Sequence, residues 1–200
     1  DYTDVMDKNY SKWAKFYDGF MFFFPLWKKW IKSVIPFIKP AKILEISFGP
    51  GYLMTQYSKN TEYEIYGMDY NPEMVKLTKN KMKKLKHAAE IIQGNVENMP
   101  YDDAAFDTVI CTMAYTGYPD GNKALNEIRR VLKDDGVFLL LDYDFPSNRN
   151  IFGYMFMKMM ESAGDILKDI KTDLKTSGFS FEESEVGGFG SIHRFICKKI

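Results

Sequence analysis

Five runs of aliphatic, β-branched and aromatic residues recur between Ala41 and Tyr143, and longer polar–apolar stretches separate them. Short apolar runs of this kind predict buried strands, whereas the stretches between them repeat their apolar residues at helical spacing. The strands are expected at residues 41–46, 62–69, 88–94, 106–112 and 137–143. Strand and helix in regular alternation predict an α/β fold, with a parallel sheet, right-handed crossovers and helices on both faces.

The helix after the second expected strand has the clearest start signal. Asn71 can accept hydrogen bonds from first-turn amides, and Pro72 at the first helical position has no N–H to leave unpaired. We expect this helix over residues 72–86, with four apolar side chains facing inward: Met74, Leu77, Met82 and Leu85. Asp120 similarly begins a helix that ends at a turn over residues 134–136.

The pattern changes after Tyr143. A methionine-rich helical region is expected from about Asn150 to Thr176, with Gly164 as the point where it would break. Two further runs, FSFEESEVGG and SIHRFICKK, are separated by a tight turn that includes the glycines of GGFG. They predict an antiparallel strand pair added to the parallel sheet.

Two aromatic helices are expected ahead of the first strand, at about residues 3–17 and 20–35. They have no place in the sheet, so we expect them to pack over it as a lid. A length of 200 residues suits a single domain. Its expected parts are the N-terminal helical lid at 1–37, a ligand-binding core at 41–143, and a helical segment with the antiparallel strand pair at 144–200.

Composition narrows the classes of partner. Lysine and arginine together number 27 and the acids also number 27, so the chain has no overall field to attract nucleic acid or an anionic membrane. We therefore expect no nucleic-acid partner. With two histidines, two cysteines and no cluster of them, the sequence offers almost no zinc ligands, and we expect no metal.

Cysteine usage and hydropathy bear on location. Cys111 and Cys197 both fall in apolar strand-like segments, which is typical of buried thiols in a reducing compartment. The richest aromatic run, GFMFFFPLW, is about half of the roughly 20 residues needed to cross a bilayer, and it contains a proline. We expect a cytoplasmic protein. The chain begins at Asp1 without a methionine, so a removed targeting segment stays an open alternative.

Four unusual groups follow the carboxyl ends of expected strands, where open parallel sheets bind ligands. The first is the turn at 49–51, Gly-Pro-Gly, whose glycines let the backbone approach a ligand at the start of a helix. Asp69 ends the second strand, at a spacing suited to ribose hydroxyls. Asn95 and Val96 follow the third strand, and residues 111–115 leave the fourth. Each alone is compatible with an ordinary turn or strand end, but their joint order favours a nucleoside ligand.

A dinucleotide-binding fold is the main competitor. Its fingerprint needs a third glycine three residues after the second, and this chain has Met54 at that position. A nicotinamide-dependent oxidoreductase is therefore disfavoured but stays open.

Four stretches carry a family resemblance: ILEISFGPG, YGMDYNPEMV, IIQGNVENMPYDDAAFDTVIC and ALNEIRRVLKDDGVFLLLD. Over residues 43–143 the chain resembles class I S-adenosylmethionine-dependent methyltransferases, of the small-molecule type similar to ubiquinone and menaquinone C-methyltransferases. The resemblance implies a Rossmann-like doubly wound sheet of seven strands in the order 3-2-1-4-5-7-6, with strand 7 antiparallel. It also implies that residues 41–143 form the cofactor-binding core and that the cofactor is S-adenosyl-L-methionine.

The resemblance further assigns residues to parts of that cofactor. Those expected at the methionine part are Glu45, Ser47, Phe48, Gly49 and Gly51. Asp69 is expected at the ribose diol. Those expected around the adenine are Tyr70, Met74, Asn95 and Val96, and those on the sulfonium side run from Cys111 to Met113.

Three departures from the family pattern stand out. Ser47 replaces the first glycine, which costs little if the backbone there is extended. Phe48 is bulky, and it either fills part of the site or faces the N-terminal helices. Asn95 replaces an acid at the adenine edge, where its carbonyl oxygen can still accept a hydrogen bond from an amino group.

Methyl transfer from a sulfonium needs mainly alignment, because the leaving group is already activated, so no dedicated catalytic residue is required. If the acceptor needs a base, the candidates are His193, Tyr115, Tyr17, Asp18 and Asp142. For His193 an ordinary surface position on the last strand is the favoured interpretation.

The shape of the acceptor should be set by the residues that cover the site. Aromatic residues at helical spacing near the N-terminus, and the run IFGYMFMKMM, favour a small apolar or aromatic acceptor, although such stripes are more often core. One alternative is a non-catalytic methyltransferase-like protein or partner subunit. Another is a lipid methyltransferase that contacts the membrane peripherally, through aromatic residues at 22–30 with Lys28 and Lys29 at the headgroups. The oligomeric state is left open.

Overall fold

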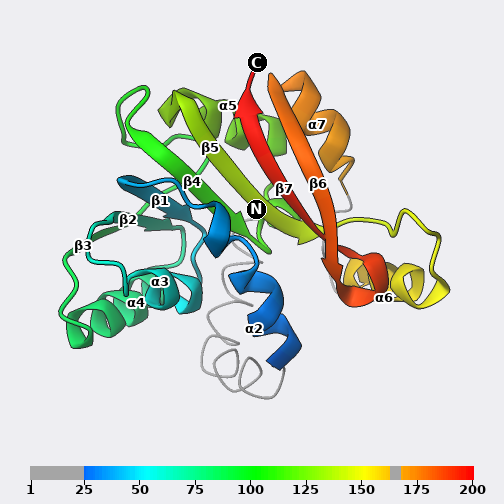
Figure 1. Cartoon of the computed structure of the whole chain (residues 1–200), viewed down its shortest axis with the longest axis horizontal. Coiled ribbons are helices and arrows are strands. Elements are labelled where there is room, and N and C mark those ends of the chain that lie inside the picture. The colour runs from blue at the N-terminus through cyan, green and yellow to red at the C-terminus, as the bar shows by residue number, and fades with distance from the viewer. Residues whose placement is uncertain (1–24, 163–167) are drawn as a thin grey trace.

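The computed structural model describes residues 25–162 and 168–200. Its centre is a seven-stranded sheet in the order β3-β2-β1-β4-β5-β7-β6 (Figure 1), which confirms the order that the family resemblance implied. The strands are β1 (Lys42–Ile46), β2 (Glu64–Asp69), β3 (Ala89–Gln93), β4 (Phe106–Thr112), β5 (Leu132–Tyr143), β6 (Phe179–Gly187) and β7 (Ile192–Lys199). The α-helices are α2 (Pro25–Lys32), α3 (Tyr52–Tyr57), α4 (Pro72–Lys84), α5 (Gly121–Val131), α6 (Ile151–Ser162) and α7 (Ile170–Thr176). Short 3-10 turns are η1 (Ile35–Phe37), η2 (Tyr115–Gly117) and η3 (Gly188–Gly190).

Strand pairing brings the expected ligand-binding segments together. β1 pairs in parallel with β2 and β4, and Ile46 lies opposite both Met68 and Cys111. The residues that follow these three strands therefore meet at one edge of the sheet. β7 runs antiparallel to β5 and β6, which confirms the predicted antiparallel pair.

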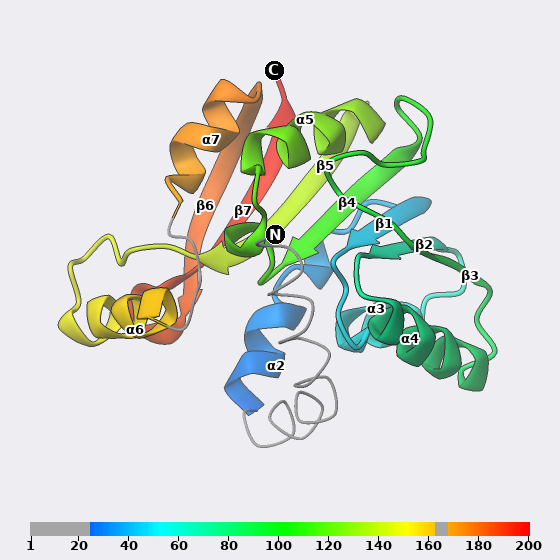
Figure 2. The same cartoon turned by 180° about the vertical axis from the view of Figure 1, so that it is seen from behind.

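Helices cover both faces of the sheet (Figures 1 and 2). Consecutive strand residues alternate between two cores, as the two-residue period of a strand requires. Ile43, Ile110 and Leu139 face the layer of α2, α3 and α4. The residues next to them along the chain, such as Leu44 and Leu140, face α5 and α7. The carboxyl edge of the parallel strands stays accessible between these layers.

Two expectations about local structure were wrong. β5 begins at Leu132 instead of residue 137, because the expected turn at 134–136 is a bulge inside the strand, between the pairs Phe106–Leu132 and Thr108–Val137. In α4, Met74 and Met82 are buried as predicted, but Leu85 is 53% exposed because the helix ends before it. Asn71 caps this helix by accepting from the amides of Glu73 and Met74.

The N-terminal segment is described from Pro25 onward, so the first expected helix and residues 1–24 lie outside the described residues. α2 packs beside the carboxyl edge, with Trp27 buried and its ring centroid 6.3 Å from that of Tyr143. Trp27 is therefore not available for the membrane contact considered from the sequence. No helix within residues 25–162 and 168–200 is long and apolar enough to cross a bilayer.

Candidate cofactor site

A cavity of about 210 Å³ opens at the carboxyl edge, beside the ends of β1, β2 and β4. Its walls include ten of the residues assigned from the sequence: Glu45, Ser47, Phe48, Gly49, Asp69, Tyr70, Met74, Asn95, Val96 and Met113. Two others, Gly51 and Cys111, do not line it. Residues that are far apart in the chain thus converge on one hollow, although nothing in the sequence fixes its dimensions.

The two glycines of the turn have different roles. Gly49 has φ +53°, and no described atom lies within 4 Å of the position that a Cβ would occupy, so its backbone borders open space. Gly51 has φ +70° and precedes α3, and a Cβ there would lie 2.5 Å from the Thr78 side chain. Gly51 therefore permits close packing of the turn on α4, whereas Gly49 leaves room for a ligand.

Asp69 connects the turn to the end of β2. Its carboxylate accepts hydrogen bonds from the backbone N–H of Gly49, at 2.8 Å, and of Asn71, at 2.9 Å. The side chain is 8% exposed and lines the cavity. Because a carboxylate can accept from several donors, contact with the turn is compatible with accepting ribose hydroxyls as well.

Glu45 lies deepest among the acids of the cavity wall, 1% exposed on β1. It accepts a hydrogen bond of 2.9 Å from the Tyr57 hydroxyl. Burial raises the pKa of its carboxyl to about 8, although the Tyr57 hydrogen bond acts in the opposite direction. At neutral pH this acid is therefore largely protonated, and a cation placed nearby would favour its ionised form.

Ser47 does not have the extended backbone expected from the sequence. Its φ is +50°, in the left-handed region that favours glycine. Its hydroxyl lies 2.8 Å from the Tyr118 hydroxyl, which in turn lies 3.4 Å from the Cys111 sulfur. The serine thus adopts a conformation that favours glycine, and a hydrogen bond to Tyr118 holds its side chain.

Phe48 does not close the site. The side chain is 6% exposed, and its ring lies about 3.1 Å from where a Cβ on Gly67 would sit. It belongs to the same core as Ile31 of α2, and both residues line the cavity. Phe48 is therefore a wall between the cofactor turn and α2, and the cavity remains open beside it.

The end of the cavity expected to hold the adenine is formed by the loop after β3. Asn95 is exposed, and its side-chain oxygen accepts from the Glu97 amide at 2.9 Å, which is the turn-forming role considered from the sequence. Val96 is buried, and Met74 and the 43% exposed Tyr70 complete this end of the cavity. A flat apolar group fits between these side chains better than a charged one.

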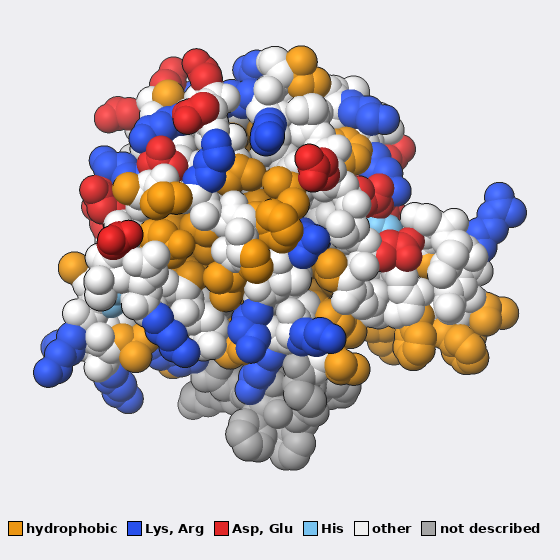
Figure 3. Space-filling model, viewed as in Figure 1, with side chains coloured by type: hydrophobic (Ala, Val, Ile, Leu, Met, Phe, Trp, Pro, Cys, Tyr) orange, Lys and Arg blue, Asp and Glu red, His pale blue; other side chains and the backbone are white. Residues whose placement is uncertain are grey.

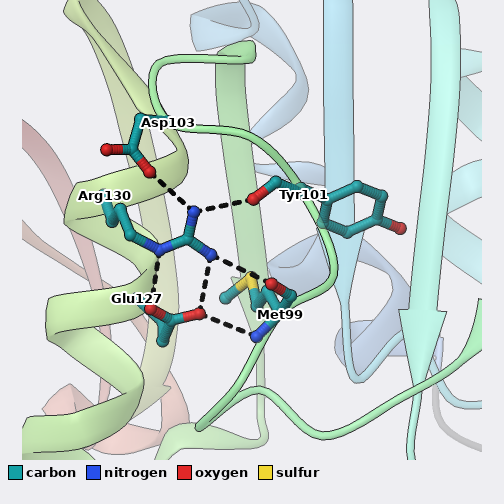
Figure 4. Close-up of polar contacts among 5 residues, drawn as sticks. All are labelled: Met99, Tyr101, Asp103, Glu127 and Arg130. Atoms are coloured by element: carbon teal, nitrogen blue, oxygen red, sulfur yellow. Dashed lines mark hydrogen bonds and ion pairs between the residues drawn. The ribbon is translucent and has the colours of Figure 1, made fainter.

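An arginine fixes the loop that carries these residues (Figure 4). The Arg130 guanidinium on α5 donates to the carbonyl oxygens of Met99 and Tyr101 and to the carboxylates of Asp103 and Glu127. Glu127 in turn accepts from the Met99 amide. The β3–β4 connection is therefore held to α5, so the end of the cavity expected to hold the adenine is positioned from outside the cavity.

Three residues expected on the sulfonium side or as bases lie behind the cavity wall. Cys111 faces the core under α5, where burial raises the pKa of its thiol to about 12. Tyr115 is fully buried and donates to Asp173 at 2.8 Å. Asp142 accepts from the amides that follow Met113, so it shapes the η2 turn. Strand alternation explains why Thr112 reaches the cavity while Cys111 faces the other side of β4. Met113 lies just past the strand, with φ +54°, and also lines the cavity.

His193 is not the surface residue expected. It is 0% exposed on β7, and its Nδ1 lies 2.6 Å from a Glu183 carboxylate oxygen. Asp144 completes a group whose possible ligand atoms lie within 4.8 Å of one another, and the Lys171 ammonium lies 2.8 Å from Glu183 in the same place. His193 does not line the cavity. Two other base candidates, Tyr17 and Asp18, lie outside the described residues.

Some wall residues were not assigned to the cofactor from the sequence. Tyr118, Ile31 and Tyr52 line the cavity, as does Ala114 beside Met113. Tyr118 could have been found from its place just after the fourth strand, but the contribution of Ile31 depends on how α2 folds back.

Taken together, the fold and the cavity define a class I nucleoside-binding domain of the methyltransferase type. Comparison with known proteins supports this class. Residues 44–140 match the family described as a methyltransferase domain. The class uses S-adenosylmethionine as its cofactor.

Relatives of known sequence and solved structures are similar to this chain. A ubiquinone/menaquinone biosynthesis C-methyltransferase of Citrifermentans bemidjiense is 26% identical over 145 residues, covering 69% of this chain and 62% of the relative. The PH0226 protein of Pyrococcus horikoshii has the same fold, with a TM-score of 0.73 at 19% identity and 93% and 99% of the two chains covered. An Aquifex aeolicus S-adenosylmethionine-dependent methyltransferase gives a TM-score of 0.61 at 18% identity, covering 78% and 81%. The chain spans less than two thirds of the length of the first curated relatives it matches.

The residues present fit this cofactor. The open space beside Gly49 admits a ligand against the backbone, and the Asp69 carboxylate borders the same cavity. Glu45, deep in the wall, is an acid that a sulfonium or ammonium group would favour in its charged form.

Proposed function

We propose that the protein transfers the methyl group of S-adenosylmethionine to a small apolar or aromatic acceptor. The observation that carries the proposal is the hydrogen bond from the Gly49 amide to Asp69, because it joins two separate cofactor motifs in the wall of one cavity. The curated relative named above acts, by its name, in quinone biosynthesis, which supports an acceptor with an aromatic ring and apolar character.

The chain's own contribution to the reaction is binding and alignment. The cofactor, when bound, supplies a methyl group already activated by a positive sulfur. Asp69 and the Gly49 backbone would hold its ribose side, and Val96 and Met74 its base. Orientation of two reactants can contribute on the order of 7–11 kcal/mol, so no base is required for an acceptor that is already nucleophilic.

The structure offers little for base catalysis. Tyr115, Asp142 and His193 are all buried behind the cavity wall and engaged with other side chains or amides. Among the described residues of the cavity wall, Glu45 is an acid with a raised pKa of about 8. This pKa suits proton exchange near neutral pH. An acceptor that must lose a proton would therefore need to approach Glu45 or arrive already ionised.

Calorimetric titration of the full chain with S-adenosylmethionine, S-adenosylhomocysteine and NAD tests the proposal. We expect micromolar binding of the first two ligands and none of NAD. Asp69→Ala should weaken binding about 100-fold, because charge-assisted hydrogen bonds contribute about 1.5–3 kcal/mol each. The matched control is Asp102→Ala, which removes an exposed acid of the β3–β4 connection that does not line the cavity.

Failure of both nucleosides to bind would refute the cofactor assignment. Binding without transfer of labelled methyl to any of a panel of quinols and phenols would instead support a non-catalytic protein of this fold. These two results are distinct, so the binding and catalytic parts of the proposal can fail separately.

A further inference from the structure

α6 exposes apolar side chains around most of its circumference. Five large ones are between 49% and 67% exposed: Ile151, Phe152, Tyr154, Met155 and Met159. Its opposite face is also apolar, with Met157 buried and Phe156 packed beside Tyr143 at 5.8 Å between ring centroids. A helix that is apolar on all sides is normally enclosed by protein or lipid, and a single helix with this much exposed apolar surface indicates a binding partner.

The position of α6 is fixed by close packing. Gly153 on its inner face accepts a hydrogen bond at its carbonyl from the Ser191 hydroxyl, at 2.8 Å. A Cβ on Gly153 would lie 2.6 Å from the Phe189 carbonyl oxygen, so only glycine allows this approach. Phe189, 66% exposed at the tip of the β6–β7 hairpin, packs beside Phe152 with the two ring centroids 5.8 Å apart. α6 and this tip therefore form one apolar surface, which we call the α6 surface.

Basic residues lie next to the α6 surface. Arg149, two residues before α6, is exposed. Lys158 on the helix itself is also exposed, and its ammonium lies 2.7 Å from the carboxylate of Glu161 on the same helix. α2 carries three lysines and no acid, and Lys29 and Lys32 are exposed. Trp27 and Phe156 both pack on Tyr143, so α2 and α6 are neighbours at the same end of the molecule. Figure 3 shows the apolar side chains of α6 and basic side chains over α2 along the lower edge of this face.

We propose that the α6 surface docks the protein on an anionic lipid bilayer. Aromatic and methionine side chains would enter the boundary between headgroups and acyl chains, and the neighbouring lysines and arginine would contact anionic headgroups. Lys158 is paired with Glu161. The unbalanced positive charge therefore comes from Lys29 and Lys32 of α2 and from Arg149. This charge favours lipid over a second copy of this chain, because two copies would bring these basic residues together. The overall charge of zero does not oppose docking, since the attraction is local.

Docking would place the cavity near the membrane. Ile31 of α2 lines the cavity, so the basic helix beside the α6 surface is also part of the cofactor site. An apolar acceptor leaving the bilayer would arrive at the edge where the cavity opens. This delivery step rests on the proposed methyl transfer, whereas the docking itself does not.

Vesicle flotation without cofactor tests the docking. Wild-type protein should float with vesicles of phosphatidylcholine and phosphatidylglycerol and bind pure phosphatidylcholine more weakly. Phe152→Ser with Met155→Ser should lower the partition coefficient about tenfold or more, because two large apolar groups no longer enter the lipid. The matched control is Leu85→Ser, which removes a comparably exposed apolar residue at the end of α4. Lys29→Glu with Lys32→Glu should remove most of the preference for phosphatidylglycerol.

Several results would overturn the docking. They are no flotation of the wild-type chain, equal flotation of the α6 double variant, or a dimer in light scattering that this variant converts to monomer. Thermal unfolding and S-adenosylmethionine titration of the same variants show whether they fold, and Met159→Ser provides a milder second change. A protein that floats but binds no cofactor would refute the methyltransferase proposal alone, and one that binds cofactor but does not float would refute docking alone.

Discussion

The two ends of the carboxyl edge are built in opposite ways. At the end formed by β1, β2 and β4, polar groups face a cavity and are held by hydrogen bonds, as with Asp69 and the Gly49 amide. At the end formed by β5 and β7, His193 is buried and meets the partly exposed Glu183, and apolar side chains of α6 face outward. In a binding site the donors and acceptors must be held in place, so each buried polar group needs a hydrogen-bond partner. A docking surface needs only exposed apolar side chains with charged side chains beside them.

The largest expected effect concerns Glu45. Its pKa is raised from 4.5 to about 8, so the folded state holds a proton that the unfolded state releases. The contribution to stability is therefore full below pH 4.5 and is lost as the pH rises to about 8. We expect the free energy of unfolding of the ligand-free protein to fall over this window by on the order of a few kcal/mol more than in Glu45→Gln.

Urea unfolding at a series of pH values measures this difference. Glutamine keeps an acceptor for the Tyr57 hydroxyl and removes the titration, so it is the matched control. Parallel pH profiles for the two proteins would show that the buried end of the cavity does not hold a neutral acid.

The two glycines separate folding from binding. Gly51→Ala should destabilise the protein by about 2–3 kcal/mol, since a left-handed alanine is strained and its Cβ meets Thr78. Gly49→Ala should cost only about 1 kcal/mol, because its Cβ meets open space. The same Cβ should weaken S-adenosylmethionine binding about tenfold by occupying ligand space. Thermal melts and calorimetry measure the two quantities, and equal losses of stability would contradict the different roles.

Ser47 and Tyr118 should be coupled. Tyr118→Phe removes the hydroxyl that holds Ser47 and should cost about 1 kcal/mol of stability. In a Ser47→Gly background, where the left-handed backbone needs no such support, the same change should cost much less. A double-mutant cycle by urea unfolding measures this coupling, and additive effects would mean that the hydrogen bond does not stabilise the turn.

The smallest effect should come from α6, at the β5–β7 end of the carboxyl edge. Met159→Ser on α6 should change stability by no more than about 0.5 kcal/mol and leave cofactor affinity unaltered, since the side chain is 57% exposed. Thermal melts and calorimetry again apply. A larger loss of cofactor affinity would show that the two ends are not independent.

Much of the fold was predictable because it depends on local pattern. The five parallel strands, the cap at Asn71 and the terminal strand pair follow from apolar periodicity and turn residues, and the resemblance supplied their order. The two errors have different causes, one tertiary and one local. Residues 134–136 are turn formers, yet pairing of Leu132 with Phe106 draws them into β5 as a bulge. Leu85 matches the helical period but falls just past the end of α4.

The candidate site was predictable to the same degree. Ten of the assigned residues line one cavity because strand ends in parallel register must meet, while Cys111 was misplaced by the alternation of strand faces. The burial of His193 could not be inferred, since its neighbours Glu183 and Asp144 come from other strands and segments.

The sequence by itself determined the order of elements and the chemical groups at each strand end, because these depend on neighbours along the chain. The tertiary structure alone decided that Ser47 is left-handed and supported by Tyr118, and that Phe48 forms a wall beside an open cavity. It also decided that the apolar side chains of α6 face outward, although the same pattern is typical of a core helix. Each of these outcomes depends on which side chain from a distant part of the sequence packs beside the residue. The spacing of residues along the chain does not specify that partner.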